Sequence, residues 1–227
     1  MITAETRLVA LLGHPVSASL SPRMQNAAFA ARELNWAYVA LDVVPEEFGT
    51  VVEGLAAAGF AGANVTTPHK RAAAEAAGSE LESVNTLVFE GGRIAGHSTD
   101  AAVLAGLAAE RPVIVGDGGA AAAFRAALPS AQVFARRGNW PPDVSDADLV
   151  VNATTEREQV LVELRPGQVL VDLPYPDTAT GQAARAAGAR VIDGLEVLVA
   201  QGAASFELWT GDSAPVDVMR RAVGLSA

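Results

Sequence analysis

Short apolar runs alternate with helical stretches from one end of the chain to the other. Apolar runs predict strands at residues 7–13, 36–43, 63–66, 83–89, 93–95, 112–116, 131–135, 148–153, 168–174 and 189–193. Helices are predicted at residues 22–34, 45–58, 119–128, 178–187 and through most of 194–224. Two strands flank Gly91 and Gly92 and predict a hairpin. Alternation of this kind is typical of parallel sheets covered by helices, so the predicted fold class is α/β.

The pattern divides the chain into two halves, each with its own sheet. The boundary is expected near residues 100–112, where a stretch of helical character, 99–110, joins the halves. The second half has the order of elements found in nucleotide-binding sheets. The chain has 227 residues, enough for one large domain or two small ones. The last stretch, 194–224, could pack on either half, and the pattern does not decide which.

Composition and charge exclude several classes of protein. Hydrophobic residues make up 50% of the chain and charged residues 19%, which is typical of a globular protein. A net charge of −10 offers no basic face for a nucleic acid. With no cysteine there can be no disulfide and no thiol nucleophile. The three histidines are widely spaced, so we expect no metal site, and His14 and His69 are expected to be polar residues at the edge of a site.

No segment has the pattern of a membrane anchor or a secretory signal. The apolar run at residues 8–12 is too short for a signal sequence and has no basic flank. No stretch approaches the roughly 18 apolar residues that cross a bilayer. A cytoplasmic protein without membrane partners is therefore expected.

A glycine-rich turn follows the strand at 112–116. Gly116, Gly118 and Ala121 fit the G-x-G-x-x-G/A pattern, directly after a β-branched strand and before a helix. In that context the glycines allow a tight turn and a close approach of backbone to a pyrophosphate, while the helix N-terminus supplies N–H donors. The alternative is a glycine-rich turn in an alanine-rich protein, with no ligand.

The residues after the next strand favour a cofactor with a 2′-phosphate. Cofactors with a free ribose call for Asp or Glu about 20 residues after the first glycine. This chain has Arg136 and Arg137 there, so we predict a preference for NADP over NAD. The alternative is an exposed basic pair at a strand end. The next crossover, 137–148, contains Pro141 and Pro142 and is predicted to be a loop.

Five polar segments, taken together and in order, resemble the shikimate dehydrogenase family. They are SASLSP (17–22), NVTTPHK (64–70), SVNT (83–86), STD (98–100) and GLEVLVAQGAASFELWTG (194–211). The glycine loop VIVGDGGAAAA and the segment DLVVNAT resemble the same family, so the similarity runs from residue 12 to 211. Each segment alone has a structural explanation, such as a helix cap or a surface lysine.

The resemblance implies an enzyme that reversibly reduces 3-dehydroshikimate to shikimate with NADPH. It implies a discontinuous substrate-binding domain, residues 1–100 and 194–227, and a Rossmann-like dinucleotide-binding domain, residues 101–193, with the active site in the cleft between them. The implied partners are small molecules, and the protein is expected to be a monomer or a homodimer.

The resemblance also assigns roles to individual positions. Lys70 and Asp100 would act at the reacting hydroxyl. The substrate would be held by Ser19, Ser21, Asn64, Thr66, Asn85, Tyr175 and Gln201. The cofactor would be held by Gly116, Gly118, Gly119, Ala120, Arg136, Arg137, Asn152, Thr154 and Gly194.

These roles are chemically reasonable. Hydride transfer to a carbonyl creates an alkoxide that needs a proton donor, which Lys70 can be, while Asp100 can position the ammonium and keep it charged. Two other functions stay open: a dehydrogenase acting on quinate or an amino-substituted ring, and a binding protein that has lost hydride transfer. Asp117, a carboxylate inside the glycine turn, favours the binding protein, whereas the Lys70 and Asp100 pair favours an enzyme.

Overall fold

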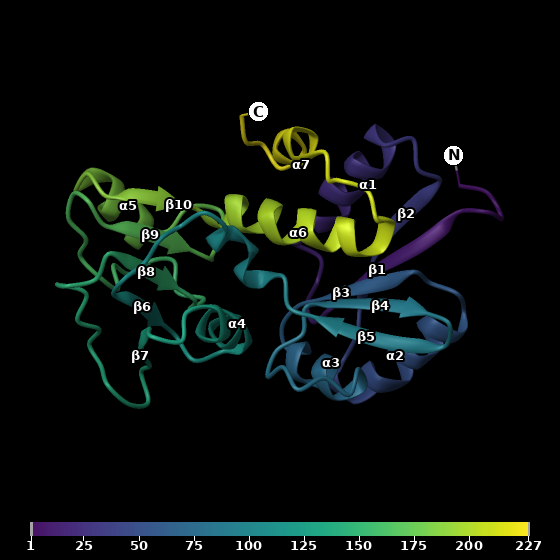
Figure 1. The fold of residues 1–227 in the computed structure, drawn as a ribbon, viewed down its shortest axis with the longest axis horizontal. Helices are drawn as coiled ribbons and strands as arrows, with labels where there is room; N and C mark the ends of the chain where they lie inside the picture. The colour runs from purple at the N-terminus through teal and green to yellow at the C-terminus, as the bar shows by residue number, and fades with distance from the viewer. Residues whose placement is uncertain (1, 227) are drawn as a thin grey trace. The chain divides into compact units, whose positions relative to one another are not determined.

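The computed structural model describes residues 2–226, which form two compact α/β units (Figure 1). Unit 1 contains the described residues up to Thr99 and those from Val199 onward, and unit 2 contains Asp100–Leu198. The boundary therefore falls inside the long helix α6 (Gly194–Thr210), which begins in unit 2 and ends in unit 1. The predicted α/β class is confirmed.

Unit 1 is built on a five-stranded mixed sheet. Its strands are β1 (Arg7–Gly13), β2 (Trp36–Asp42), β3 (Gly62–Val65), β4 (Thr86–Glu90) and β5 (Arg93–His97), in the order β2-β1-β3-β4-β5. Strand β1 pairs in parallel with β2 and β3, while β4 and β5 form the predicted antiparallel hairpin. Besides α6, the helices are α1 (Ser21–Ala31), α2 (Phe48–Ala57), α3 (Lys70–Ala76) and α7 (Val216–Ala222), with a 3-10 turn, η1 (Pro45–Glu47), before α2.

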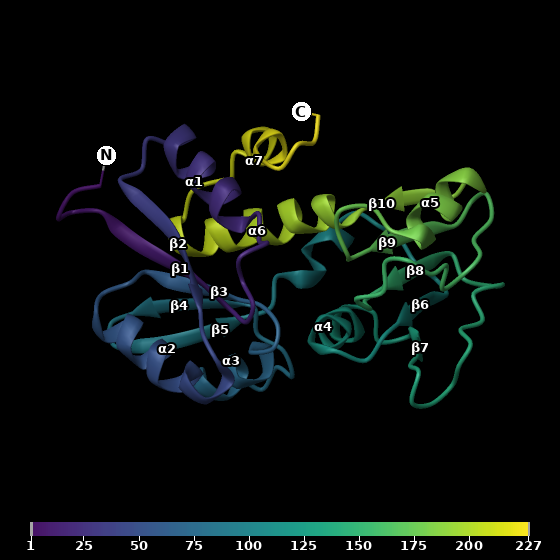
Figure 2. The same ribbon diagram turned by 180° about the vertical axis from the view of Figure 1, so that it is seen from behind.

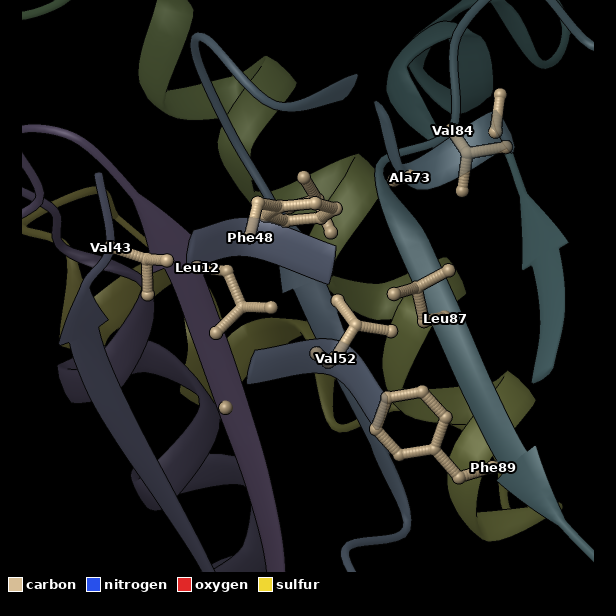
Figure 3. Packing of buried hydrophobic residues seen from close by; sticks show 12 residues of the cluster. Leu12, Val43, Phe48, Val52, Ala73, Val84, Leu87 and Phe89 are labelled. Carbon is tan, nitrogen blue, oxygen red and sulfur yellow. The ribbon is translucent and has the colours of Figure 1, made fainter. Parts of the chain in front are cut away.

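Helices α2 and α3 cover one face of this sheet. Figure 3 shows Phe48 and Val52 of α2 pointing toward Leu12 of β1 and Leu87 of β4, and all four side chains are buried. Each such side chain stabilises the fold by about 1.5–3 kcal/mol relative to its exposed state. On the other face lie α1 and the C-terminal part of α6, as the two opposite views in Figures 1 and 2 show.

The C-terminal helices complete unit 1, which answers the question that the sequence left open. The ring of Phe206 in α6 stacks on Phe29 of α1 with centroids 5.5 Å apart. The indole N–H of Trp209 donates a hydrogen bond to the Leu87 carbonyl at 3.0 Å. Helix α7 then packs on α1. Buried aromatic side chains thus attach the C-terminal helices to the N-terminal part of unit 1.

Unit 2 is built on a five-stranded parallel sheet. Its strands are β6 (Pro112–Val115), β7 (Gln132–Phe134), β8 (Leu149–Asn152), β9 (Val169–Asp172) and β10 (Arg190–Ile192), in the order β10-β9-β8-β6-β7. Two helices, α4 (Gly119–Ala127) and α5 (Ala179–Ala186), and the 3-10 helix η2 (Asp100–Leu104) pack around it. This is a doubly wound arrangement in which the strand order reverses at β6.

Side chains of the unit 2 strands alternate between two apolar cores. Val113 and Val115 of β6 point into one core with Ala184 of α5, whereas Ile114 points into the other with Phe124 of α4. Strand side chains alternate faces because the period of a strand is two residues. Burial on both faces explains why these strands read as continuous apolar runs.

The structure corrects one prediction about the connections, adds one helix that was not predicted and confirms one predicted loop. The joining stretch 100–112 is helical only in η2, and after it Gly106 has a φ of +80°, which ends any helix. Helix α3 was not predicted, because its sequence follows a proline and is only seven residues long. Between β7 and β8 the chain forms a loop, as the two consecutive prolines predicted.

Membrane-spanning helices and metal clusters are both absent from residues 2–226. No helix there combines the length and the apolar character needed to cross a membrane. No group of three or more His, Asp or Glu side chains among these residues is arranged to hold a metal ion.

A substitution at Gly62 can test how tightly α6 packs on the sheet of unit 1. A Cβ at this position would clash with the Leu87 carbonyl and the Trp209 indole, the two groups that hydrogen-bond to each other. We expect Gly62→Ala to lower the free energy of unfolding by about 1–3 kcal/mol, measured by urea denaturation. The control is Gly54→Ala, at an exposed helical position with open space, which should raise it by about 0.5–1 kcal/mol. Equal effects at both positions would contradict the close packing.

Candidate functional site

Polar loops gather at one edge of the unit 1 sheet. Strands β1, β3 and β5 end at this edge and β4 begins there, because β4 runs antiparallel to its neighbours. The topology therefore places four segments together: 14–20, 66–70, 83–85 and 98–99. Three of the candidate substrate-binding residues, Ser19, Thr66 and Asn85, lie in these segments, together with Lys70. We call the four segments the polar edge.

Asn85 is the centre of the polar edge. Its Oδ1 accepts a hydrogen bond from the backbone N–H of Thr99 at 2.7 Å, and its Nδ2 donates to Thr99 Oγ1 at 2.9 Å. The same Nδ2 lies 3.5 Å from Gln201 Oε1 of helix α6. Asn85 is buried and Gln201 is half-buried, so two residues 116 positions apart in sequence meet at one place.

Asn64 is a buried residue whose hydrogen bonds hold Asn85 and helix α6 together. The side chain is buried, and its Oδ1 accepts a hydrogen bond from the Tyr38 hydroxyl at 2.8 Å. Its Nδ2 is within 3.1 Å of the Asn85 carbonyl and of Thr86 Oγ1, and within 2.9 Å of Ser205 Oγ. Buried amides need such partners to offset the cost of desolvation. Asn64 therefore links strands β2, β3 and β4 to helix α6.

Two serines and a threonine complete the polar groups of this edge. Ser19 Oγ accepts a hydrogen bond from the backbone N–H of Ser21 at 3.2 Å, which orders the start of α1. Ser21 is buried and Ser19 is half-buried. Thr66 follows β3, and a Cβ on Gly13 would come within 2.4 Å of its methyl group, so Gly13 leaves room for Thr66 in this position.

Lys70 begins helix α3 beside these residues. It is partly buried, and its carbonyl accepts a hydrogen bond from Val84 N–H at 3.0 Å, next to Asn85. The residue before it, His69, is only 2% exposed, so the expectation of a polar residue at the edge of the site is wrong for His69. Its ring stacks on Phe48 with centroids 4.7 Å apart, and its Nε2 lies 2.7 Å from the Val43 carbonyl. This buried ring anchors the segment that carries Lys70.

His14 is exposed, unlike His69. Its Nδ1 lies 2.6 Å from Asp42 Oδ1, at the ends of the neighbouring strands β1 and β2. The hydrogen bond with His14 is the main cause that lowers the pKa of Asp42. This pair joins the two strands at the surface of unit 1.

Unit 2 has its own pocket, of about 670 Å³, at the carboxyl ends of β6, β7 and β8. That is where the strand order reverses, which is the usual place for a ligand in a doubly wound sheet. Its lining consists of Gly116, Asp117, Gly118, Arg136, Arg137, Trp140, Ala153, Thr154, Thr155 and Glu156.

The glycine turn has the geometry that a pyrophosphate requires. Gly116 has a φ of +121°, and a Cβ there would come within 3.0 Å of the Ala153 carbonyl group. Gly118 caps α4 without any side-chain hydrogen bond, and Gly119 and Ala120 form the first positions of that helix. The N–H groups of this first turn are therefore not covered by a capping side chain, and they suit an anion. These residues fit a dinucleotide cofactor.

Asn152 shapes the opposite wall of the pocket from a buried position. Its Oδ1 accepts from Thr154 Oγ1 at 2.8 Å, and its Nδ2 donates to Asp172 Oδ1 at 2.7 Å. Burial is the main cause that raises the pKa of Asp172, while hydrogen bonds from Thr178 and Asn152 oppose the rise. Because Asn152 bonds to the loop that follows β8, it fixes the path of 153–156 along the pocket.

Both arginines line the pocket, and the structure adds two residues that the sequence did not single out. The Arg136 guanidinium lies 5.6 Å from the centre of the Trp140 ring, and its Nη2 is 3.2 Å from Glu156 Oε2. Trp140 lies in the proline-containing loop. A large aromatic residue so close in sequence to two arginines could have indicated that it lines the same pocket. Glu156 carried no such signal, because it lies twenty residues after Arg136.

The remaining candidates also lie in unit 2. Asp100 is buried and is the first residue of η2, directly after Thr99. Tyr175 is half-buried and follows β9 closely. Gly194 begins α6 so near the carbonyls of Leu173 and Pro174 that a Cβ there would clash with both.

Comparison with known proteins finds family models for parts of this chain and relatives along its full length. Residues 11–87 match the family model for the shikimate dehydrogenase substrate binding domain, and residues 194–223 match that for the shikimate 5′-dehydrogenase C-terminal domain. A protein of Moorella thermoacetica named shikimate dehydrogenase (NADP(+)) is 40% identical, over all of this chain and 97% of its own length. That alignment spans 285 positions, more than the 227 residues of this chain, which is therefore a compact relative.

Solved structures agree as well. The shikimate dehydrogenase of Aquifex aeolicus superposes with a TM-score of 0.87 and 30% identity, covering 99% of this chain and all of that one. The shikimate 5-dehydrogenase of Thermus thermophilus, in complex with NADP(H) and shikimate, superposes with a TM-score of 0.83 and 31% identity, covering 95% of this chain and 98% of that one. With relatives this similar along its full length, the chain belongs to the shikimate dehydrogenase family.

Proposed function

We propose that the protein is an NADP-dependent shikimate dehydrogenase, which reversibly reduces 3-dehydroshikimate to shikimate in the biosynthesis of aromatic amino acids. The observation that carries the proposal is the polar edge of unit 1. Hydroxyl and amide groups converge there beside the start of the helix that carries Lys70, in a chain that also has a glycine-lined pocket. The proposal is supported by full-length relatives named shikimate dehydrogenase (NADP(+)).

The polar edge suits a ring that carries several hydroxyls and a carboxylate. The proposed substrate contacts are Ser19, Ser21, Asn64, Thr66, Asn85, Tyr175 and Gln201. Such a site rejects an analogue that lacks a hydroxyl, because its own buried polar groups would then have no partner. Asn85 and Gln201 are held by the buried network below them, so little side-chain entropy has to be lost on binding.

Lys70 is proposed to donate the proton to the oxygen that becomes the hydroxyl, and to accept it in the reverse direction. The bound nicotinamide cofactor supplies the hydride. Asp100, a buried carboxylate, is proposed to orient the ammonium and to favour its charged form. His69 keeps the start of α3 in place, so the lysine does not depend on a mobile loop for its position.

Unit 2 is proposed to bind the cofactor, and unit 1 to contribute the proposed substrate contacts other than Tyr175. The pyrophosphate would lie at Gly116, Gly118, Gly119 and Ala120, and the adenosine 2′-phosphate at Arg136 and Arg137. Asn152, Thr154 and Gly194 would shape the remaining wall. The protein is proposed to act in the cytoplasm as a monomer or homodimer. Sedimentation of the purified protein can test which of these two oligomeric states it has.

The proposed activity is tested by mixing the protein with shikimate and either NADP⁺ or NAD⁺ and following the absorbance of the reduced nicotinamide. Turnover with shikimate and NADP⁺ is expected. Quinate as the better substrate would point to the related dehydrogenase. Calorimetric binding of shikimate without turnover would identify a binding protein instead.

Lys70→Ala should lower kcat by about 10²–10⁴-fold, the usual contribution of a general acid. The dissociation constant for shikimate, measured by calorimetry, should change by less than about tenfold, because a proton donor acts mainly in the transition state. Arg71→Ala is the matched control, since that side chain is 88% exposed and pairs with Glu75 in the next turn of the same helix. Turnover of Lys70→Ala at the level of the unaltered enzyme would contradict the role.

Arg136→Ala and Arg137→Ala should raise the KM for NADP⁺ by at least about tenfold and change the KM for NAD⁺ much less. The reason is that only NADP⁺ has the 2′-phosphate that these guanidinium groups would bind. Arg190→Ala, at an exposed position of strand β10 at the opposite edge of the sheet, is the control. Equal effects on the two cofactors would rule out the assignment.

A further inference from the structure

A carboxylate shares the unit 2 pocket with the two arginines. Glu156 and Arg136 both line it, with Oε2 of Glu156 3.2 Å from Nη2 of Arg136. The glutamate side chain is 22% exposed and that of Arg136 is 61% exposed, so the acid is the more enclosed partner. The group proposed to bind a phosphate thus already has an anion beside it.

The position of this carboxylate is fixed by its own loop. Glu156 Oε1 accepts hydrogen bonds from the backbone N–H groups of Arg157, Glu158 and Gln159, at 3.1, 3.0 and 3.3 Å. Its own N–H donates to Thr154 Oγ1 at 3.2 Å. The bonds to the carboxylate, that from Glu158 first among them, and the Arg136 side chain lower the pKa of Glu156. One oxygen is committed to the loop, and the other faces Arg136.

The carboxylate oxygen that faces Arg136 would therefore affect the two kinds of cofactor differently. A phosphate on Arg136 would have to displace Oε2 or lie next to it, and two adjacent anions repel each other. A ribose with a free 2′-hydroxyl would instead meet a carboxylate that can accept its hydrogen bond, as acidic residues do in NAD sites. The pocket thus contains a determinant for each cofactor.

Arg136 does not depend on Glu156 alone for its position. Its guanidinium also lies against the ring of Trp140, 5.6 Å from the centroid, which is within the range of a cation–π contact. Removing the negative charge of Glu156 should therefore leave Arg136 in the pocket and make it available to a phosphate.

We propose that Glu156 is a specificity-determining residue of the cofactor pocket, which competes with the adenosine 2′-phosphate for Arg136 and so reduces the preference for NADP over NAD. This inference rests on the proposed function, because it requires the dinucleotide to bind in this pocket. The two arginines by themselves would give a strong preference for NADP over NAD. The inference is that one side chain, Glu156, makes this preference weaker.

The test is Glu156→Gln, with NADP⁺ and NAD⁺ titrated separately into the full-length protein by calorimetry at low ionic strength. Glutamine keeps an oxygen to accept the three backbone hydrogen bonds but presents no charge to Arg136. We expect the Kd for NADP⁺ to fall by about 1.5- to fivefold, the range that partly exposed charge pairs give. The Kd for NAD⁺ should stay the same or rise, so that the ratio of the two shifts toward NADP⁺.

Glu158→Gln is the matched control, since it removes the same charge from the same loop at an exposed position. It should leave the ratio of the two dissociation constants unchanged, and thermal unfolding should show that both variants fold. An unchanged ratio in Glu156→Gln, or weaker binding of NADP⁺, would overturn the inference while leaving the proposed function intact. If the unaltered protein binds neither dinucleotide, the proposed function and the inference both fail.

Discussion

The buried amide of Asn64 is the interaction on which unit 1 depends most. Through its two polar atoms, strands β2, β3 and β4 are bonded to Ser205 of helix α6. A buried amide that lost these partners would cost about 1–3 kcal/mol for each unsatisfied group. Ser205 Oγ also donates to the Gln201 carbonyl one turn earlier, at 2.9 Å. The same network that stabilises the fold thus places Gln201 beside Asn85.

In unit 2 the corresponding constraint is the close approach of Gly116 to the Ala153 carbonyl. It brings the turn after β6 against the loop after β8, and Asn152 holds that loop by its bonds to Thr154 and Asp172. The result is a pocket whose lining includes two glycines of the turn and the charged residues Arg136, Arg137 and Glu156. If the anion binds to the backbone of the glycine turn, as proposed, side chains such as Glu156 can tune the choice of cofactor without affecting the fold.

The local sequence predicted the elements well where their pattern is strong. The strand at 7–13, the glycine hairpin and the loop with two prolines all appear at their predicted places. The errors fall on short elements. In the joining stretch a positive φ at Gly106 outweighs the local helix propensity. Helix α3 agrees with the propensity of its own residues but is only seven residues long, too short for a clear pattern.

The sequence by itself determined the α/β class, the glycine turn and the family motifs, because these depend on the order of residue types within short windows. Only the tertiary structure decided that the C-terminal helix α6 packs on the unit 1 sheet through Trp209 and Phe206, and that His69 is buried. It alone showed that Glu156 lies against Arg136. Such contacts join residues far apart in sequence, and a side chain's charge or polarity does not reveal which distant partner the packing will give it.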